Sequence, residues 1–299
     1  MKIEEIKELI QDIDSGKIKT LKQNSKFKFT CTMCGKCCFS RDVIINIYEL
    51  VRMRNALKMT TSQLFQNKII TTFIGAESGL PLCMINMKNK ACPLLAPIYF
   101  SEDIKTKQDL EKINNFNKPT NHYGCAINKH KPMMCRLYPV GRIIKIDKNN
   151  KMSSKFILSK EEVCKEAFDN GKEWTLKEWL DNIEFKHYKA GSANFTSLIK
   201  LLNDKGFNVS KKDGKLQKNS NLLNILITIM FDFDSLGVFK NNKIVQSTIT
   251  NKNTTHKNFM YVTNLVTEFI KNFVTLTSSD FKTSEKVATK FINESRTKH

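Results

Sequence analysis

Four cysteines stand within eight residues near the start of the chain, and their spacing suits metal binding. The stretch FTCTMCGKCCFSR contains Cys31, Cys34, Cys37 and Cys38. Two cysteines separated by two residues can direct both sulfurs at one centre, and Gly35 supplies the backbone freedom that such a turn requires. Neighbouring side chains diverge. Cys37 and Cys38 are therefore expected to serve different metal atoms, or only one of them is a ligand.

Four further cysteines extend the candidate ligand set. Cys92 lies in ACPLLAP, Cys125 and Cys135 lie in GCAINKHKPMMCRLYPVGR, and Cys164 lies in EEVCKEAF. All-thiolate coordination suits both zinc and iron–sulfur chemistry, so eight thiols could hold a four-iron cluster, a zinc site or two centres. The first cysteine run begins like a ferredoxin motif but continues directly into its fourth cysteine instead of inserting three residues. Spacing alone does not choose the metal.

Other polar and sulfur-containing residues near these motifs have simpler interpretations. Cys83, in LPLCMIN, reads as a small buried apolar residue. His122 and His130 lie close to Cys125 and could be ligands, but solvated loop histidines fit the pattern better. Arg41, Arg136 and Arg142 flank the cysteines and could offset the charge of a cluster. For Arg136 the alternative is a structural pair with a carboxylate at a helix end.

The composition limits the functions to consider. The chain has 299 residues, enough for one large domain or two modest ones, and a net charge of +20. Such a charge could favour nucleic acid, an anionic membrane or an acidic partner. However, the lysines are dispersed and arginine, the usual reader of bases and phosphates, is scarce. We therefore interpret the charge as solvated protein surface and expect no nucleic-acid partner.

The expected compartment is the cytoplasm. The longest apolar run, LLNILITIMF at 222–231, is about half the length that a membrane span requires. The N-terminal sequence MKIEEIKELIQDIDSGK has no signal-peptide core. Thiols stay reduced in the cytoplasm, so nine cysteines there indicate metal rather than a disulfide framework.

Helical periodicity dominates the C-terminal half of the chain. Thr175 and Glu178 form a potential capping box before WLDNI. Apolar stripes at helical spacing follow at 222–230 and 259–273, and both are interpreted as core. The segment 209–220 reads as a turn or short hairpin.

The N-terminal half is mixed. Isoleucines at helical spacing predict a helix from residue 3 to a stop at Gly16. The stretch 42–59 predicts a strand-like entry and then a helix, and Thr60 with Gln63 forms a second potential capping box. The stretch 140–158 predicts a hairpin with its turn at DKNN.

These patterns predict an α+β protein whose composition changes near residue 165. All nine cysteines lie between 31 and 164 and all six prolines between 81 and 139, so the later part can form long helices. The expected organisation is an N-terminal helix at 1–26, a loop-rich cysteine-cluster metal domain at 27–165 and a mainly α-helical C-terminal domain at 166–299.

The cysteine motifs resemble those of the YkgJ-type CxxCxxCC cysteine-cluster family. That family carries C-x-x-C-G-x-C-C, then C-P-F-L, then C-x-I-Y-x-x-R-P-x-x-C-R-x-Y/F-P. The residues that match are Cys31, Cys34, Gly35, Cys37, Cys38, Cys92, Pro93, Leu95, Cys125, Ile127, Pro132, Cys135, Arg136, Tyr138 and Pro139. The resemblance covers about residues 27–165. Asn128 and Lys131 depart from the family pattern, and a charged insertion at 101–120 separates the second and third motifs.

The resemblance implies a zinc- or iron-chelating protein, often described as iron–sulfur, with a 4Fe-4S cluster as the first expectation and zinc as the alternative. One branch of the family is the flagellin lysine methylase. A protein-lysine N-methyltransferase would require S-adenosyl-methionine and a protein substrate. The nearest glycine-rich loop, FIGAESGLP at 73–81, is a weak match to a nucleotide-binding turn. Whether the chain is an enzyme is left open, and no catalytic residue is assigned.

A third class, a zinc-knuckle nucleic-acid binder, would need aromatic residues to stack on bases. Phe27, Phe29 and Phe39 are the candidates near the knuckle. Phenylalanines spaced by two more commonly mark a strand with one buried face. The sequence names no protein partner.

Overall fold

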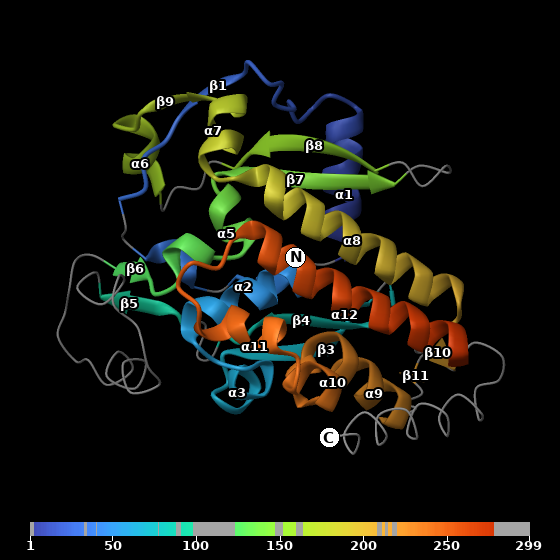
Figure 1. The fold of residues 1–299 in the computed structure, drawn as a ribbon. Coiled ribbons are helices and arrows are strands. Elements are labelled where there is room, and N and C mark those ends of the chain that lie inside the picture. The colour runs from blue at the N-terminus through green and yellow to red at the C-terminus, as the bar shows by residue number, and fades with distance from the viewer. Residues whose placement is uncertain are drawn as a thin grey trace. The chain divides into compact units, whose positions relative to one another are not determined.

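The structure is a computed structural model. It describes residues 3–32, 35–39, 41–76, 78–87, 91–97, 123–146, 152–159, 164–207, 211–212, 215–216 and 220–277. Outside these ranges lie Cys34, His122, the 101–120 insertion and the expected DKNN turn. Helices and short strands alternate in the first half and helices prevail in the second, which confirms the α+β class (Figure 1).

The chain divides into two compact units, each built from two separate segments. Unit 1 comprises Met1–Cys37 and Met133–Lys186, and unit 2 comprises Cys38–Pro132 and His187–His299. The units therefore interleave along the sequence, whereas the expected organisation is consecutive. The division at residues 26 and 165 stays a prediction.

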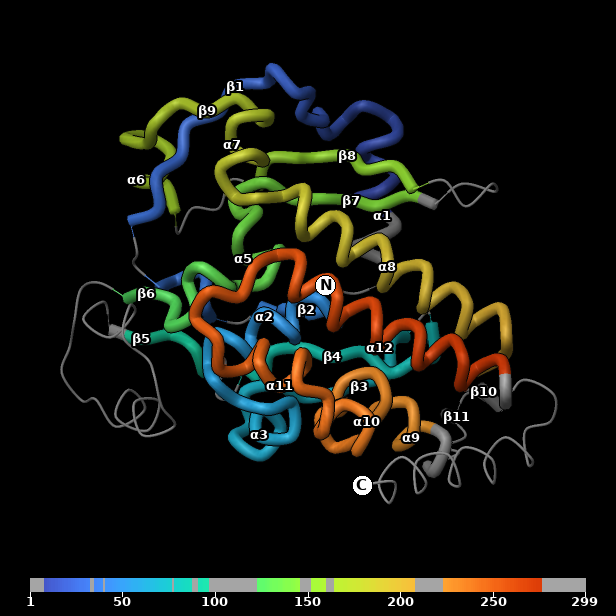
Figure 2. Tube along the Cα trace, in the orientation of Figure 1, coloured from blue at the N-terminus to red at the C-terminus, as the bar shows by residue number. Residues whose placement is uncertain are grey.

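Unit 1 consists of short helices and two antiparallel strand pairs. Its helices are α1 (Ile3–Asp14), α5 (Met133–Leu137), α6 (Lys165–Asp169) and α7 (Leu176–Asn182), and its strands are β1 (Lys26–Lys28), β7 (Val140–Ile146), β8 (Met152–Leu158) and β9 (Glu173–Thr175). Strand β1 pairs with β9, and β7 pairs with β8 as the predicted hairpin. Helix α1 lies beside this hairpin, with Asp14 paired to Lys145 and Lys155 at 2.5 and 3.0 Å (Figure 2).

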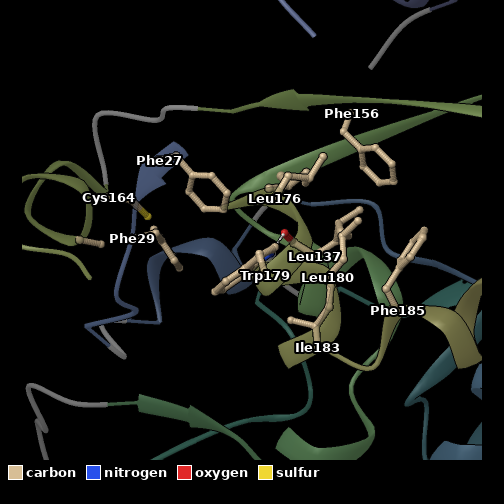
Figure 3. Packing of buried hydrophobic residues seen from close by; sticks show 12 residues of the cluster. Phe27, Phe29, Leu137, Phe156, Cys164, Leu176, Trp179, Leu180, Ile183 and Phe185 are labelled. Atoms are coloured by element: carbon tan, nitrogen blue, oxygen red, sulfur yellow. Dashed lines mark hydrogen bonds between the residues drawn. The ribbon is translucent and has the colours of Figure 1, made fainter. Parts of the chain in front are cut away.

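An aromatic cluster around Trp179 forms the core of unit 1 (Figure 3). The Phe27 and Phe29 rings meet Trp179 edge-on, with centroids 5.9 and 5.8 Å away. The indole nitrogen of Trp179 donates a hydrogen bond to the Leu137 carbonyl at 3.0 Å. Because edge-to-face aromatic pairs bury much apolar surface and fix ring orientation, this cluster anchors β1, α5 and α7 to one another.

Unit 2 combines a small antiparallel sheet with several helices. The sheet has the order β2 (Ile44–Ile45), β4 (Pro81–Ile85), β3 (Ile70–Ile74), and two further strand pairs join β5 (Leu95–Pro97) to β6 (Tyr123–Cys125) and β10 (Lys211–Lys212) to β11 (Lys215–Leu216). The helices are α2 (Ile47–Leu57), α3 (Thr61–Gln66), α8 (Phe185–Asp204, which begins in unit 1), α9 (Ser220–Phe231), α10 (Gly237–Lys240), α11 (Lys243–Thr250) and α12 (His256–Thr277). The described residues also form short 3₁₀ turns, among them η4 (Asn128–His130) and η6 (Phe233–Ser235) in unit 2 and η1 (Lys36–Cys38), which crosses from unit 1 into unit 2.

Local sequence signals explain where several helices begin. The Thr60 and Thr175 side chains each accept a hydrogen bond from the backbone N–H three residues later. The Gln63 and Glu178 side chains in turn accept one from the backbone N–H of Thr60 and Thr175, so both predicted capping boxes are confirmed. Asn46 and Glu49 form a third capping box at the start of α2. The predicted apolar stripes lie on α9 and α12 and are largely buried.

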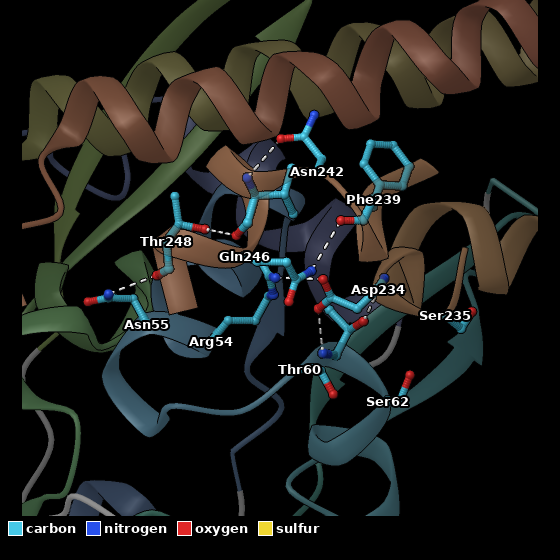
Figure 4. A network of polar contacts seen from close by, with 12 residues as sticks. Arg54, Asn55, Thr60, Ser62, Asp234, Ser235, Phe239, Asn242, Gln246 and Thr248 are labelled. Atoms are coloured by element: carbon cyan, nitrogen blue, oxygen red, sulfur yellow. Dashed lines mark hydrogen bonds and ion pairs between the residues drawn. The ribbon is translucent and has the colours of Figure 1, made fainter. Parts of the chain in front are cut away.

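Helix α2 is buried on nearly every side and contains two buried arginines. Arg54 is 0% exposed and donates to the Asp234 carboxylate at 2.5 Å (Figure 4). The other carboxylate oxygen of Asp234 accepts the Thr61 backbone N–H at 2.8 Å, at the start of α3. Burial lowers the pKa of the Arg54 guanidinium. This pair joins α2, α3 and η6 at the centre of unit 2.

The helices in the part of the chain that the structure describes are all too short or too polar to cross a membrane.

Removal of the Asp234 carboxylate should destabilise the fold strongly. Asp234→Ala leaves the Arg54 charge buried without its counter-ion, and we expect the free energy of unfolding to fall by about 3–5 kcal/mol. Glu268→Ala is the matched control, because Glu268 pairs with Lys271 on the exposed surface of α12, where a pair contributes at most about 1 kcal/mol. Urea unfolding measures both variants. Equal losses would contradict the central role of the buried pair.

Candidate metal centre

The structure describes seven of the eight predicted ligand cysteines, since Cys34 lies outside the described residues. Cys31 is exposed and Cys164 is buried, whereas the other five are partly buried: Cys37, Cys38, Cys92, Cys125 and Cys135. Partial exposure leaves a thiol accessible to an ion from solution. Six of the seven described candidates are thus at least partly exposed.

Cys83 differs from these cysteines in its surroundings. It is 0% exposed at the centre of strand β4, where it faces Ile45 of β2 and Thr72 of β3 in the sheet register. Burial raises the pKa of the Cys83 thiol, so the thiolate that a metal requires is disfavoured. The interpretation of Cys83 as a buried apolar residue is confirmed.

In unit 1, the segment before Cys31 is hydrogen-bonded to the segment after Cys164. The Thr30 N–H donates to the Ala167 carbonyl and the Phe29 N–H donates to the Lys172 carbonyl, both at 2.9 Å. The Trp174 indole also donates to the Phe29 carbonyl at 2.9 Å. Cys164 directly precedes α6, and Cys31 directly follows Thr30. Two cysteines that are distant in the sequence are therefore carried by chain segments bound to each other.

Helix α5, which carries Cys135, is held in the same unit by its neighbours. Arg136 donates through Nε to the Ile183 carbonyl at 3.1 Å, and its guanidinium lies 3.6 Å from the Glu184 carboxylate. Glu184 stands directly before α8, so the predicted alternative of a pair with a carboxylate at a helix end is confirmed for Arg136. Together with the Trp179 contact to Leu137, this fixes α5 against the end of α7.

In unit 2, backbone hydrogen bonds bring three more cysteine-bearing segments together. The Cys92 N–H donates to the Cys38 carbonyl at 2.9 Å, and the Leu95 N–H donates to the Cys92 carbonyl at 3.1 Å. Leu95 is the strand partner of Cys125 in the β5–β6 pair. Cys38, Cys92 and Cys125, which span 88 positions, are thus connected through adjacent backbone.

The donor set fits a thiophilic metal, because every predicted ligand is sulfur. Among the described residues, no group of three or more His, Cys, Asp or Glu side chains is arranged so that it could hold a metal ion. Cys34, at the centre of the first motif, is not among them. The ligand set Cys31, Cys34, Cys37, Cys38, Cys92, Cys125, Cys135 and Cys164 remains a prediction.

Arg142 and His130, which lie near the predicted ligands in the sequence, each contact residues of their own unit. Arg142 lies on β7, donates to the Ser154 hydroxyl at 3.0 Å and to the Met133 sulfur at 3.8 Å, and faces the Phe185 ring at 5.1 Å. Burial lowers the pKa of the Arg142 guanidinium. The His130 ring packs edge-on against Phe259 of α12 at 5.9 Å. His130 is partly buried, so its interpretation as a solvated loop histidine is corrected to a half-buried residue that packs on α12.

The loop considered for S-adenosyl-methionine is a hairpin turn. It joins the antiparallel strands β3 and β4, and the Gly75 N–H donates to the Leu80 carbonyl at 2.9 Å. A nucleotide-binding loop of the expected kind leads from a strand into a helix, so this segment does not provide one. The turn gives no support to a methyltransferase.

The phenylalanines considered for base stacking separate into two groups. Phe27 and Phe29 are buried in the Trp179 cluster, at 6% and 4% exposure, as the strand interpretation predicts. Phe39 is exposed and its backbone bridges to Ala91. Because bases stack on accessible rings, the buried pair cannot form a stacking platform.

Comparison with known proteins gives one match. Residues 30–165 match the family model described as "CxxCxxCC: Putative zinc- or iron-chelating domain". This confirms the resemblance drawn from the cysteine motifs, and it covers every predicted ligand. Over these residues the chain is similar to the domain that this family model describes. No curated protein and no solved structure matches the chain.

Gly171 allows the Cys31 and Cys164 segments to approach each other. A Cβ at this position would lie 2.6 Å from Phe29 backbone atoms and 2.4 Å from the Ala167 carbonyl oxygen. We expect Gly171→Ala to lower the free energy of unfolding by about 3 kcal/mol, because backbone atoms cannot rotate aside.

The control for this substitution is Gly206→Ala. Gly206 has a φ of +75° but open space around its Cβ position, so its substitution should cost only about 1–2 kcal/mol of backbone strain. Denaturant unfolding compares the two variants. A loss for Gly171→Ala no larger than that for Gly206→Ala would show that the close approach is not required.

Proposed function

We propose that the chain binds an iron–sulfur cluster, a 4Fe-4S centre, through thiolates of its cysteine domain. Support comes from the donor set: a 4Fe-4S cluster is held by four cysteine thiolates, and this domain has eight candidate cysteines. The two C-x-x-C spacings within residues 31–37 occur in iron–sulfur ligand runs as well as in zinc sites. When bound, the cluster would supply one-electron chemistry or hold the domain in its fold.

The residues of this chain would act on such a centre by position and by charge. The paired segments of unit 1 carry Cys31 and Cys164, and the β5–β6 region of unit 2 carries Cys92 and Cys125. These segments are short and have little regular structure, so metal bound by their thiols would add to the stability of each segment. Structural thiolate sites contribute on the order of 10 kcal/mol to folding.

The proposal also implies a setting for the protein. Cysteines bind metal as thiolates only while they are not oxidised to disulfides, so a reducing compartment such as the cytoplasm suits this domain. The partner is unknown, and a protein partner or protein substrate is the class that a cluster-containing domain would serve. Methyl transfer finds no supporting feature among the described residues and is not proposed.

Anaerobic purification with metal and sulfide analysis tests the proposal. We expect iron with acid-labile sulfide and a broad visible absorption shoulder. Cys34→Ser should reduce the iron content severalfold, because a hydroxyl is a poor substitute for a thiolate ligand. Cys83→Ala is the control, since Cys83 is buried in β4, and it should retain the metal content of the unmodified protein.

Two outcomes would count against parts of this proposal. Zinc without sulfide would reject the iron–sulfur cluster while keeping a metal-chelating function. Full iron content in Cys34→Ser would show that Cys34 is not a ligand and that the proposed ligand set is wrong.

A further inference from the structure

The segment that follows Cys125 is bound by side chains from helices of unit 2. Its short turn η4 lies between Cys125 and Cys135 in the sequence. The Lys129 carbonyl accepts a hydrogen bond from the Arg52 guanidinium at 2.8 Å, and the Lys131 carbonyl accepts one from the Tyr188 hydroxyl at 3.1 Å. Arg52 belongs to α2 and Tyr188 belongs to α8, so two helices remote in sequence hold one loop.

Arg52 is held in a fixed orientation by aromatic rings. It is 5% exposed, and its guanidinium carbon lies 4.9 Å from the Tyr188 ring centre, 5.3 Å from that of Phe259 and 5.8 Å from that of Tyr48. A guanidinium over ring faces is attracted by their electron density and keeps its planar fork immobile. The donor to the Lys129 carbonyl is therefore held in one orientation by the surrounding rings.

A second layer of contacts supports Arg52 in turn. Arg52 also donates to the Tyr48 hydroxyl oxygen at 3.1 Å, and that oxygen lies 2.9 Å from His256 Nδ1. Since the oxygen accepts from Arg52, its own proton is available to the histidine nitrogen. The His187 ring lies against His256, with centroids 3.7 Å apart. The support thus extends from the loop through α2 to α12 and α8.

The loop needs this support because its own structure is minimal. Strand β6 has three residues and ends at Cys125, and η4 is a single turn of three residues. Elements this short are not stable by themselves. Strand β5 pairs with the backbone at Cys125, and the Arg52 and Tyr188 side chains bind the backbone that follows it.

We infer that Arg52 and Tyr188 are positioning residues of the metal centre, acting through the Lys129 and Lys131 carbonyls on the segment that carries Cys125. This inference rests on the proposed function. It assigns part of the helical region a specific task, which is to hold a ligand-bearing loop in the geometry that retains the metal. Groups that orient ligands in this indirect way commonly change metal affinity by about 10–100-fold when removed.

The test compares the rate at which the full-length metal-loaded protein loses metal to a chelator. Tyr188→Phe removes one hydroxyl and no packing surface, and Arg52→Lys keeps the charge but loses the planar fork. We expect both variants to lose metal about tenfold faster or more. Amide hydrogen exchange at Ala126 and His130 should also become faster in both, with or without metal, because the His130 N–H donates to the Ile127 carbonyl within the segment and the Ala126 N–H joins the start of the segment to the Leu94 carbonyl.

Matched controls separate positioning from general stability. Arg54→Lys alters the other buried arginine of α2, which binds Asp234, and Tyr261→Phe alters an exposed tyrosine of α12. Arg54→Lys should lower the melting temperature, yet both controls should keep the metal-loss rate within about twofold, since neither group contacts the loop.

The outcomes distinguish this inference from the function on which it rests. An unmodified protein that binds no metal overturns the proposed function and the inference with it. Metal that dissociates at the same rate from Tyr188→Phe, Arg52→Lys and the unmodified protein overturns the inference alone. Should Arg52→Lys not fold, Tyr188→Phe decides the question by the same two measurements.

Discussion

Short cysteine-bearing segments cannot hold their thiols in place unless something else fixes their backbone. Turn η1 has three residues, β5 and β6 have three each, and α5 has five, all too short to be stable alone. Their geometry therefore depends on hydrogen bonds and side chains from larger packed elements.

Each unit meets this requirement with a different kind of core. Unit 1 uses aromatic packing: the Trp179 cluster joins the strand before Cys31 to the helix of Cys135. Unit 2 uses a buried helix, α2, whose two arginines point to different partners. Arg54 ties α2 to Asp234, and Arg52 reaches the backbone after Cys125. Buried charge makes these contacts specific, because an unpaired guanidinium in the core is costly.

Features determined by nearby residues could be predicted from the sequence, and those determined by distant residues could not. The capping boxes at Thr60 and Thr175 and the hairpin at 140–158 depend on local chemistry. The pairing of Arg54 with Asp234 joins residues 180 positions apart, and no local pattern marks it. The capping box of Asn46 with Glu49 was missed although Asn-x-x-Glu is visible in the sequence. For the site, the cysteine motifs predicted the family match, and the apolar surroundings of Cys83 predicted that it is not a ligand. The sequence did not show which distant segments bind the backbone beside each cysteine.

The proposed function requires that sulfur atoms of this domain bind metal directly. X-ray absorption at the metal edge, recorded on protein purified without oxygen, tests it most directly. We expect a first coordination shell of sulfur alone, at about 2.3 Å from the metal. A first shell of nitrogen or oxygen, or a protein without bound metal, would contradict it.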